Sequence, residues 1–232
     1  NLFINDLPQI FNENNSLPAK LEDITIGCLL YADDLVILSE SHLGLQNSLN
    51  KLDQYCQKWK LKINTSKTQI VIFNSKGSNS GAFHIDDNEI KIVSSYKYLG
   101  IIMHKSGKFH QGIETLSSKA LKSLFCLQKA LYSDKISPID MQIKAFDSVI
   151  IPILTYCSEI WGQDLLHNSK EFKTNIIDDK SKIEVVHMRF CKRILGVPTL
   201  SSNVAVRSEL GRMPIMFNIV NNVFKYYVRL ES

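Results

Sequence analysis

Hydrophobic residues along the first hundred positions come in short runs separated by polar turns. Two branched apolar runs, at 24–30 and 35–38, flank the polar step Tyr31-Ala32-Asp33-Asp34, which predicts two buried strands joined by a hairpin. Further short runs that predict strands lie at 61–64, 69–73, 83–85, 90–93 and 98–102, the last three in one small antiparallel sheet.

Longer stretches repeat every 3.6 residues and predict helices. Ser39 or Ser41 can cap a helix in which apolar residues recur at three- and four-residue steps from Leu45 to Trp59. After Gly107 this period dominates, so the chain changes from mixed α and β to nearly all helix. The helices predicted there begin near 110 and at Ser137-Pro138, the latter bending or breaking near Pro152, and cover 180–195, 202–210 and 214–230.

These patterns predict an α+β fold: a mixed part over residues 1–108 and a mostly α-helical part over 109–232. The composition of the 232 residues, 44% hydrophobic and 22% charged, excludes an intrinsically disordered chain. No apolar stretch approaches the roughly 20 residues of a membrane span, and no secretory signal is visible. We therefore expect no membrane association and an intracellular protein, in the nucleus, the cytoplasm or both, that is not secreted.

Cysteine spacing and charge add two constraints. The five cysteines form no CxxC pair, which disfavours a disulfide framework or a zinc site. Residues 1–50 carry a net charge of −6, whereas all five arginines lie from Arg189 onward. A basic second part is compatible with a polyanion partner, although an ordinary solvated surface is the simpler explanation of charge alone.

The residues that point to chemistry are Asp33 and Asp34. Adjacent carboxylates repel each other, and burial between apolar strands would raise the cost of charging both. A divalent cation such as Mg²⁺, which prefers oxygen ligands, would relieve that repulsion. Neighbouring strand residues point to opposite faces, so we expect Asp33 to be the principal ligand and Asp34 the helper. An exposed Asp-Asp turn without metal is the alternative, because aspartate is favoured in turns.

The flanking residues change this picture. The segment Gly-Cys-Leu-Leu-Tyr-Ala-Asp-Asp-Leu-Val-Ile-Leu resembles the catalytic Tyr-x-Asp-Asp hairpin of reverse transcriptases, with the alanine typical of non-LTR (LINE-type) retrotransposon enzymes. Other segments similar to that family follow in the expected order: Asn1 to Pro8, Trp59 to Thr68 with 70–73, Tyr96 to Ile101, Arg193-Ile-Leu-Gly, and Glu209 to Pro214.

The resemblance implies an RNA-directed DNA polymerase with two-metal nucleotidyl transfer. Residues 1–108 would be the C-terminal part of a palm, with an antiparallel sheet packed against helices, and 109–232 a helical thumb and post-thumb region. Asp33 and Asp34 would hold two Mg²⁺ ions, and Lys67 would approach the leaving pyrophosphate. The partners would be an RNA template, a DNA primer and deoxynucleoside triphosphates.

The resemblance also implies contacts with nucleic acid. Tyr31 would lie beneath the primer terminus, and Tyr98, Leu99 and Gly100 would support the primer strand. The alternatives are a half-buried strand tyrosine and a core strand with a bulge, and Lys67 could equally be an ordinary exposed lysine. Three basic residues of the second part would contact phosphates, namely Arg189, Lys192 and Arg193, each of which could also be a solvated charge.

The same family pattern includes a third catalytic carboxylate on a strand that would precede Asn1. We therefore expect an N-terminally incomplete chain that is inactive in isolation, either a fragment or a decayed copy. A catalytically inactive, retrotransposon-derived module that binds nucleic acid is the alternative function.

Overall fold

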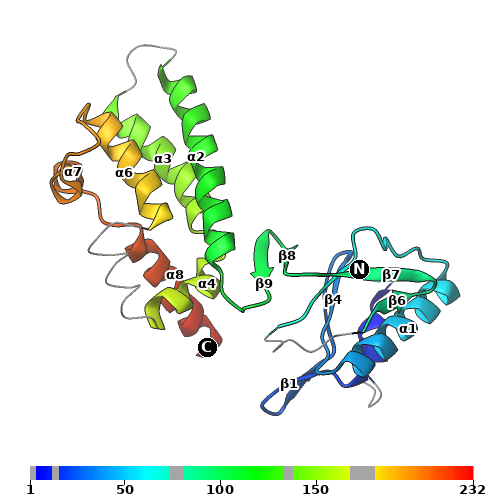
Figure 1. The fold of residues 1–232 in the computed structure, drawn as a ribbon. Helices are drawn as coiled ribbons and strands as arrows, with labels where there is room; N and C mark the ends of the chain where they lie inside the picture. The colour runs from blue at the N-terminus through cyan, green and yellow to red at the C-terminus, as the bar shows by residue number, and fades with distance from the viewer. Residues whose placement is uncertain (1–3, 12–15, 74–80, 133–137, 168–180, 232) are drawn as a thin grey trace. The chain divides into compact units, whose positions relative to one another are not determined.

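The computed structural model describes residues 4–11, 16–73, 81–132, 138–167 and 181–231. The chain divides into two compact units, Asn1–Tyr96 and Lys97–Ser232, called here the sheet unit and the helical unit (Figure 1).

The sheet unit combines one long helix with short strand pairs. In chain order its elements are η2 (Leu7–Phe11), β1 (Ala19–Leu21), β2 (Ile24–Ile26), β3 (Cys28–Tyr31), β4 (Asp34–Ile37), α1 (His42–Trp59), β5 (Gln69–Val71), β6 (Phe83–Ile85), β7 (Asn88–Val93) and the start of β8 (Ser95–Tyr98). The strands β1 and β2 pair antiparallel, as do β3 and β4, and a separate sheet has the order β5-β7-β6.

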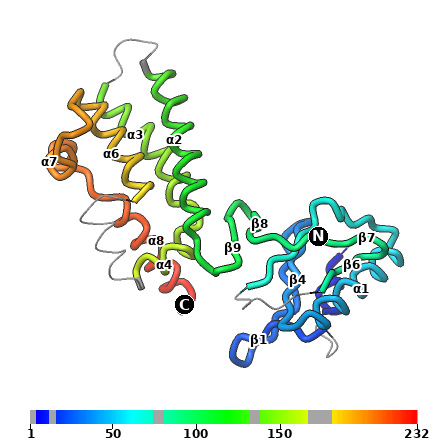
Figure 2. Tube along the Cα trace, in the orientation of Figure 1, coloured from blue at the N-terminus to red at the C-terminus, as the bar shows by residue number. Residues whose placement is uncertain are grey.

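Helix α1 connects the two cores of this unit. Of the two predicted caps, Ser39 and Ser41, it is Ser41 that caps this helix by accepting a hydrogen bond from the Gly44 amide, and Lys60 ends it in a left-handed conformation. Leu52 packs with Leu7 and Phe11 in one core, whereas Leu49 packs with strands β5, β6 and β7 in the other. The Cα trace in Figure 2 shows α1 running past β6, which it contacts.

Several strand predictions need correction. Residues 61–64 form no strand, β5 runs parallel to β7, and 98–102 do not join the sheet of β6 and β7. The parallel pairing of β5 arises because the chain between β5 and β7 crosses back through β6, so β5 and β7 enter the sheet from the same end. The mixed α and β character is confirmed, but its strands lie in several small sheets rather than one.

The helical unit opens with a hairpin and continues with packed helices. Strand β8 pairs with β9 (Ile101–His104), and the helices are α2 (His110–Tyr132), α3 (Ile139–Leu154), α4 (Ser158–His167), α6 (Lys182–Ile194), α7 (Asn203–Glu209) and α8 (Met216–Glu231). Its core joins Leu124 of α2, Phe146 and Ile150 of α3 and Phe190 of α6, and the rings of Phe146 and Phe190 stack with centroids 3.9 Å apart.

The helix predictions hold well here. Those for 180–195, 202–210 and 214–230 correspond to α6, α7 and α8. Ser137 lies outside the described residues, and α3 begins after Pro138. Pro152 lies inside α3, which ends shortly after it at Leu154, in agreement with the predicted bend or break near this proline.

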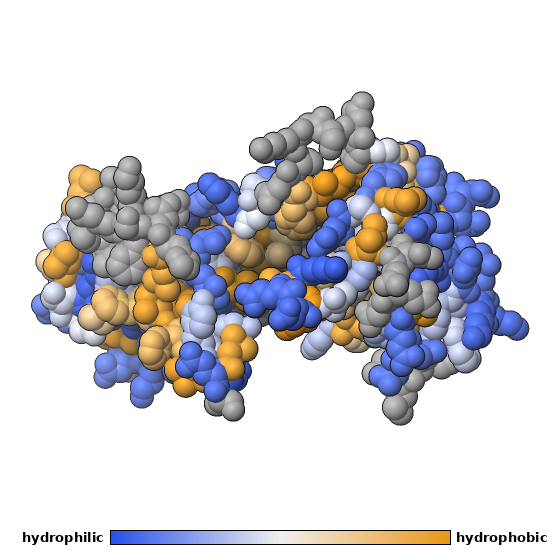
Figure 3. Space-filling view, turned by 90° about the horizontal axis from the view of Figure 1, so that it is seen from below, coloured by the Kyte–Doolittle hydropathy of each residue, from blue (hydrophilic) through white to orange (hydrophobic). Residues whose placement is uncertain are grey.

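Apolar residues also reach the surface. Figure 3 shows hydrophobic residues on the visible face of the helical unit, on the left, and the exposed side chains of α8 include Phe224, Val228 and Leu230. Even so, none of the helices described is long and apolar enough to cross a membrane.

Candidate active site

The two candidate metal ligands lie at the tip of the β3–β4 hairpin. Tyr31 stands directly opposite Asp34 in the ladder, which leaves Ala32 and Asp33 as a two-residue loop. Ala32 has a φ of 55°, a left-handed conformation that is costly for a residue other than glycine. The predicted hairpin is thereby confirmed, with a tight and strained turn.

This tip is exposed rather than buried. One face of the hairpin packs through Cys28, Leu35 and Ile37 against the core around Phe11, but Leu29 and Tyr31 on the other face are 45% and 64% exposed. Asp33 and Asp34 are exposed as well. The prediction of two buried strands is therefore wrong, because within the described chain no second layer covers that face. Burial imposes no cost on either carboxylate here.

The donor set at the tip consists of two carboxylates. Among the residues that the structure describes, no group of three His, Cys, Asp or Glu side chains could hold a metal ion. Mg²⁺ is commonly bound through one or two carboxylates together with substrate phosphates and water. Asp33 and Asp34 thus fit the protein's share of a nucleotide-dependent magnesium site, but not a closed site made by protein alone.

The chain contains a second hairpin of the same chemistry. Asp86 and Asp87 form the two-residue loop between β6 and β7, both are exposed, and Asp86 has a φ of 53°. Aspartate tolerates the left-handed conformation and is favoured in turns. Turn preference alone therefore accounts for an adjacent aspartate pair at a hairpin tip, and this second pair serves as a control for the first.

Lys67 lies in the same unit, in a turn that leads into β5. Its side chain is exposed, and its backbone amide donates to the carbonyl oxygen of Asn64 at 3.1 Å. The turn fixes the position of the Lys67 backbone, while the ammonium group extends into solvent. An exposed cation before a strand is compatible with both interpretations of this residue.

Asp6 has a structural partner. Its Oδ1 accepts a 2.6 Å hydrogen bond from the hydroxyl group of Tyr55, and its carbonyl oxygen accepts from the amide of Gln9 in the first turn of η2. Burial, together with this hydrogen bond, raises the pKa of Tyr55 to about 12. Asp6 therefore anchors the N-terminal segment on α1.

The predicted primer-contacting residues form a turn in the helical unit. Strand β8 ends at Tyr98 and β9 begins at Ile101, so Leu99 and Gly100 are the loop, with φ values of 44° and 90°. A positive φ at both loop positions is characteristic of the type I′ turns that join two-residue hairpins. The alternative of a bulged core strand is therefore wrong, because the chain reverses at this point.

The three predicted phosphate contacts lie on α6 and are held by neighbouring groups. The guanidinium of Arg189 lies 4.8 Å from the ring centroid of Phe125, and Arg193 donates to Gln128 at 2.9 Å. Lys192 donates to the carbonyl oxygen of Thr199 at 2.6 Å. Arg189 and Arg193, four residues apart, are both exposed on one side of the helix, whereas Lys192 is half-buried and fixes the following loop.

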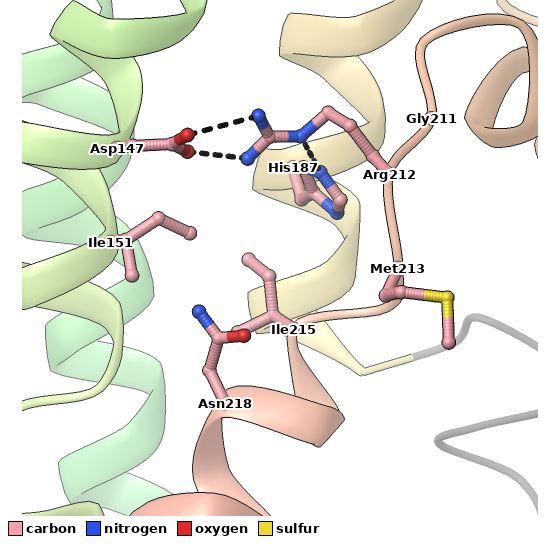
Figure 4. A pocket seen from close by; sticks show the side chains of 8 residues that line it. All are labelled: Asp147, Ile151, His187, Gly211, Arg212, Met213, Ile215 and Asn218. Carbon is pink, nitrogen blue, oxygen red and sulfur yellow. Dashed lines mark hydrogen bonds and ion pairs between the residues drawn. The ribbon is translucent and has the colours of Figure 1, made fainter.

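Sequence reasoning missed a polar cluster in the same unit, which extends from the buried His187 to the exposed Asp147. Arg212 donates to both carboxylate oxygens of Asp147 and to Nε2 of His187, at the edge of a cavity of about 460 Å³ that also adjoins Met213 and Asn218 (Figure 4). The charge of Arg212 is already matched by Asp147, so this cavity offers no reason to assign a ligand. In the sequence, Arg212 was a late basic residue within the segment Glu209 to Pro214, and nothing in its spacing marked its partners.

Comparison with known proteins bears on the sheet unit and the β8–β9 hairpin. Residues 1–103 match the family described as reverse transcriptase (RNA-dependent DNA polymerase). This stretch contains the β3–β4 hairpin, Lys67 and the Leu99–Gly100 turn. No solved structure matches the chain.

The curated relatives come from mobile elements. The RNA-directed DNA polymerase from mobile element jockey of Drosophila funebris is 23% identical over 237 residues, covering 100% of this chain and 24% of the relative. The corresponding jockey protein of Drosophila melanogaster is 24% identical and covers 90% and 22%. A transposon-derived protein of Caenorhabditis elegans is 31% identical over 140 residues, covering 57% and 48%.

The chain spans about a quarter of the length of the jockey polymerases. The similarity to them nevertheless extends over 90% or more of this chain, helical unit included. Together with the family match over residues 1–103, it supports the assignment of the chain to the reverse transcriptases of non-LTR (LINE-type) retrotransposons.

Proposed function

We propose that the chain is the C-terminal palm and the thumb of an RNA-directed DNA polymerase, with Asp33 and Asp34 as its ligands for Mg²⁺. The observation that carries this proposal is the β3–β4 hairpin, whose tip exposes Asp33 in the two-residue turn and Asp34 at the start of β4, beside Tyr31. The turn lies within the segment that matches the reverse transcriptase family.

Each residue has a defined part in the proposal. Asp33, in the loop, and Asp34, at the first position of β4, would share the divalent ions with the triphosphate of the incoming nucleotide. Such ions lower the pKa of a primer hydroxyl and stabilise charge on the transferred phosphate. Lys67 would neutralise or protonate the leaving pyrophosphate, and Tyr31 would contact the primer terminus.

The helical unit would supply the contacts that hold the duplex. Arg189 and Arg193 are exposed on one side of α6, and we propose that they bind phosphates without regard to sequence. Lys192 would contribute indirectly, by holding the loop that contains Thr199 next to α6. Tyr98, Leu99 and Gly100 would support the primer strand at the β8–β9 turn. We propose that residues 1–108 form the C-terminal part of the palm and that residues 109–232 form the thumb and post-thumb region.

The test compares the two aspartate hairpins of the chain. Asp33→Asn and Asp34→Asn are set against Asp86→Asn and Asp87→Asn, which remove the same charge from the same kind of turn. Binding of Mn²⁺ as a spectroscopic substitute for Mg²⁺ is measured by electron paramagnetic resonance in the presence of an RNA–DNA template–primer and a deoxynucleoside triphosphate. We expect the first pair of variants to lose bound Mn²⁺ and the second pair to retain it.

Primer extension and duplex binding are measured in parallel. We expect any extension by the unmodified chain to disappear in Asp33→Asn. Template–primer affinity should be unchanged in that variant. Equal Mn²⁺ binding by all four variants would overturn the metal assignment. Duplex binding in that case would favour the alternative, a nucleic-acid-binding module without catalysis.

A further inference from the structure

A single side chain joins the β8–β9 turn to the helices of the same unit. The hydroxyl group of Tyr156 donates a 2.9 Å hydrogen bond to the carbonyl oxygen of Leu99, across 57 positions of sequence. Tyr156 lies between α3 and α4, in a part of the chain that the sequence marked for no function. The contact therefore connects a predicted primer-supporting turn to a residue outside every recognised motif.

The ring of Tyr156 also lies against Gly100. A Cβ atom added at this glycine would lie 3.0 Å from Cε1 of the ring and 3.3 Å from its hydroxyl oxygen. Glycine is thus required twice here, by its φ of 90° and by the close approach of the ring. The ring of Tyr156 therefore helps to determine the conformation of the turn, together with strands β8 and β9.

Leu99 needs such external support. Type I′ turns favour Asn-Gly because both central residues have positive φ, and a leucine at the first position pays a steric penalty without a local hydrogen bond in return. Strained residues of this kind persist when their surroundings hold them. The hydroxyl group of Tyr156 and its ring supply that support from outside the turn.

Tyr156 is itself held from the buried core. Its carbonyl oxygen accepts a 2.7 Å hydrogen bond from Nε1 of Trp161, whose side chain is only 1% exposed. The next residue, Cys157, adopts a left-handed φ of 52°. The backbone at Tyr156 is therefore fixed, and its ring can position the turn rather than follow it.

We propose that Tyr156 is a positioning residue that holds the Leu99–Gly100 turn in the conformation that contacts the primer strand. The consequence for nucleic acid rests on the proposed function, whereas the positioning itself does not. Tyr156 is 45% exposed, so replacing its hydroxyl group disturbs no buried polar group of the core.

The test removes only the hydroxyl group. Tyr156→Phe keeps the ring against Gly100, and Tyr227→Phe is the matched control, since Tyr227 is 47% exposed in the same unit and donates to Gln163 at 3.2 Å. Hydrogen exchange of the amides over 97–104 is measured in the full chain. We expect exchange about 3- to 10-fold faster in Tyr156→Phe, the range given by loss of one hydrogen bond, and no change in Tyr227→Phe.

A rescue variant separates positioning from general destabilisation. Leu99→Asn places in the turn a residue that tolerates positive φ, so it should restore slow exchange in the Tyr156→Phe background. Fluorescence anisotropy with an RNA–DNA template–primer should show weaker binding by Tyr156→Phe than by Tyr227→Phe.

The outcomes distinguish the two proposals. Unchanged exchange in Tyr156→Phe, or faster exchange that Leu99→Asn does not reverse, would overturn the positioning role. Faster exchange that Leu99→Asn reverses supports that role even if the unmodified chain binds no template–primer, a result that would count against the proposed function alone. Binding that stays unaltered while exchange changes would overturn the link between the turn and the primer.

Discussion

His187 donates its Nδ1 hydrogen to Oε1 of Glu184, 2.9 Å away and one turn earlier on α6. The direction follows from the other ring nitrogen, because Nε2 lies 2.9 Å from Nε of Arg212, and a guanidinium only donates. Both α6 side chains are buried, at 1% and 2% exposure. A neutral imidazole of fixed tautomer thus links Glu184 to the loop before α8.

Glu184 also satisfies two further donors. Arg207 of α7 donates to its Oε1 at 3.1 Å, and the backbone amide of Ile215 donates to its Oε2 at 2.9 Å. One carboxylate therefore ties α6 to α7 and to the start of α8. Because α7 is short, it has few apolar contacts of its own, and its position depends on this cluster.

Replacing Glu184 by glutamine should strongly destabilise the helical unit. Arg207, 7% exposed, would then lack its carboxylate partner, and breaking a buried pair in this way typically costs about 3–5 kcal/mol. Urea unfolding measures the change. Glu114→Gln is the control, because Glu114 pairs with Lys182 at the surface, where the loss should stay below about 1 kcal/mol. Equal losses in both variants would show that the cluster does not hold α7.

Two glycines of the helical unit should respond oppositely to alanine. At Gly162 in α4 an added Cβ would lie 2.7 Å from Cγ2 of Ile219 and 3.0 Å from Cγ2 of Val223, so Gly162→Ala should push α4 from α8 and cost about 1–3 kcal/mol. At Gly112 in α2 the nearest atom, the carbonyl oxygen of Ile102, lies 3.6 Å away. Gly112→Ala should be neutral or stabilise by up to about 1 kcal/mol. Thermal unfolding compares them, and a stabilised Gly162→Ala would contradict the packing of α4 on α8.

Short-range sequence patterns predicted the elements that depend on contacts between residues close in the sequence. Ser41 caps α1 where its spacing placed it, and the Tyr31–Asp34 hairpin follows from two apolar runs around a polar step. The helices α6, α7 and α8 follow from periodicity in the same way. In each case the decisive contacts lie within a few residues of one another.

Long-range pairing could not be predicted from these patterns. The parallel alignment of β5 with β7 and the exposure of Leu29 depend on which strands neighbour each other, which periodicity does not specify. The support of Leu99 by Tyr156 spans 57 positions and involves an ordinary tyrosine. At the candidate site, the sequence marked Asp33 and Asp34 as candidate ligands but left open whether their turn is buried or exposed, because that depends on which elements cover the hairpin.

Thiol modification should follow the burial of the cysteines. Cys126 is exposed, Cys28 and Cys157 are half-buried, and Cys56 and Cys191 are buried. Burial raises the pKa of Cys191 to about 12, which also suppresses its reactive thiolate. We expect iodoacetamide at pH 8 to label Cys126 first and Cys191 last, as followed by peptide mass spectrometry. Early labelling of Cys191 would mean that the core of the helical unit opens readily.

Tyr55 should make the sheet unit sensitive to alkaline pH. Its pKa in the folded chain is raised from its ordinary value near 10 to about 12, first by burial and then by the hydrogen bond to Asp6. Between these values the unfolded chain has released the phenolic proton while the folded chain retains it. The unfolded state then binds fewer protons, so stability falls as pH rises from about 10 to about 12 and is unaffected by this group below pH 10.

Tyr55→Phe should remove most of that slope. Urea unfolding at a series of pH values from 9 to 11 measures it, with tryptophan fluorescence as the signal, since Trp59 lies beside Tyr55 at 6.2 Å between ring centroids. A smaller slope should persist because burial also raises the pKa of the Cys56 thiol. Tyr31→Phe is the control, as this tyrosine of the same unit is 64% exposed and should leave the slope unchanged. An equally steep decline in Tyr55→Phe would show that the phenol is not held neutral against Asp6.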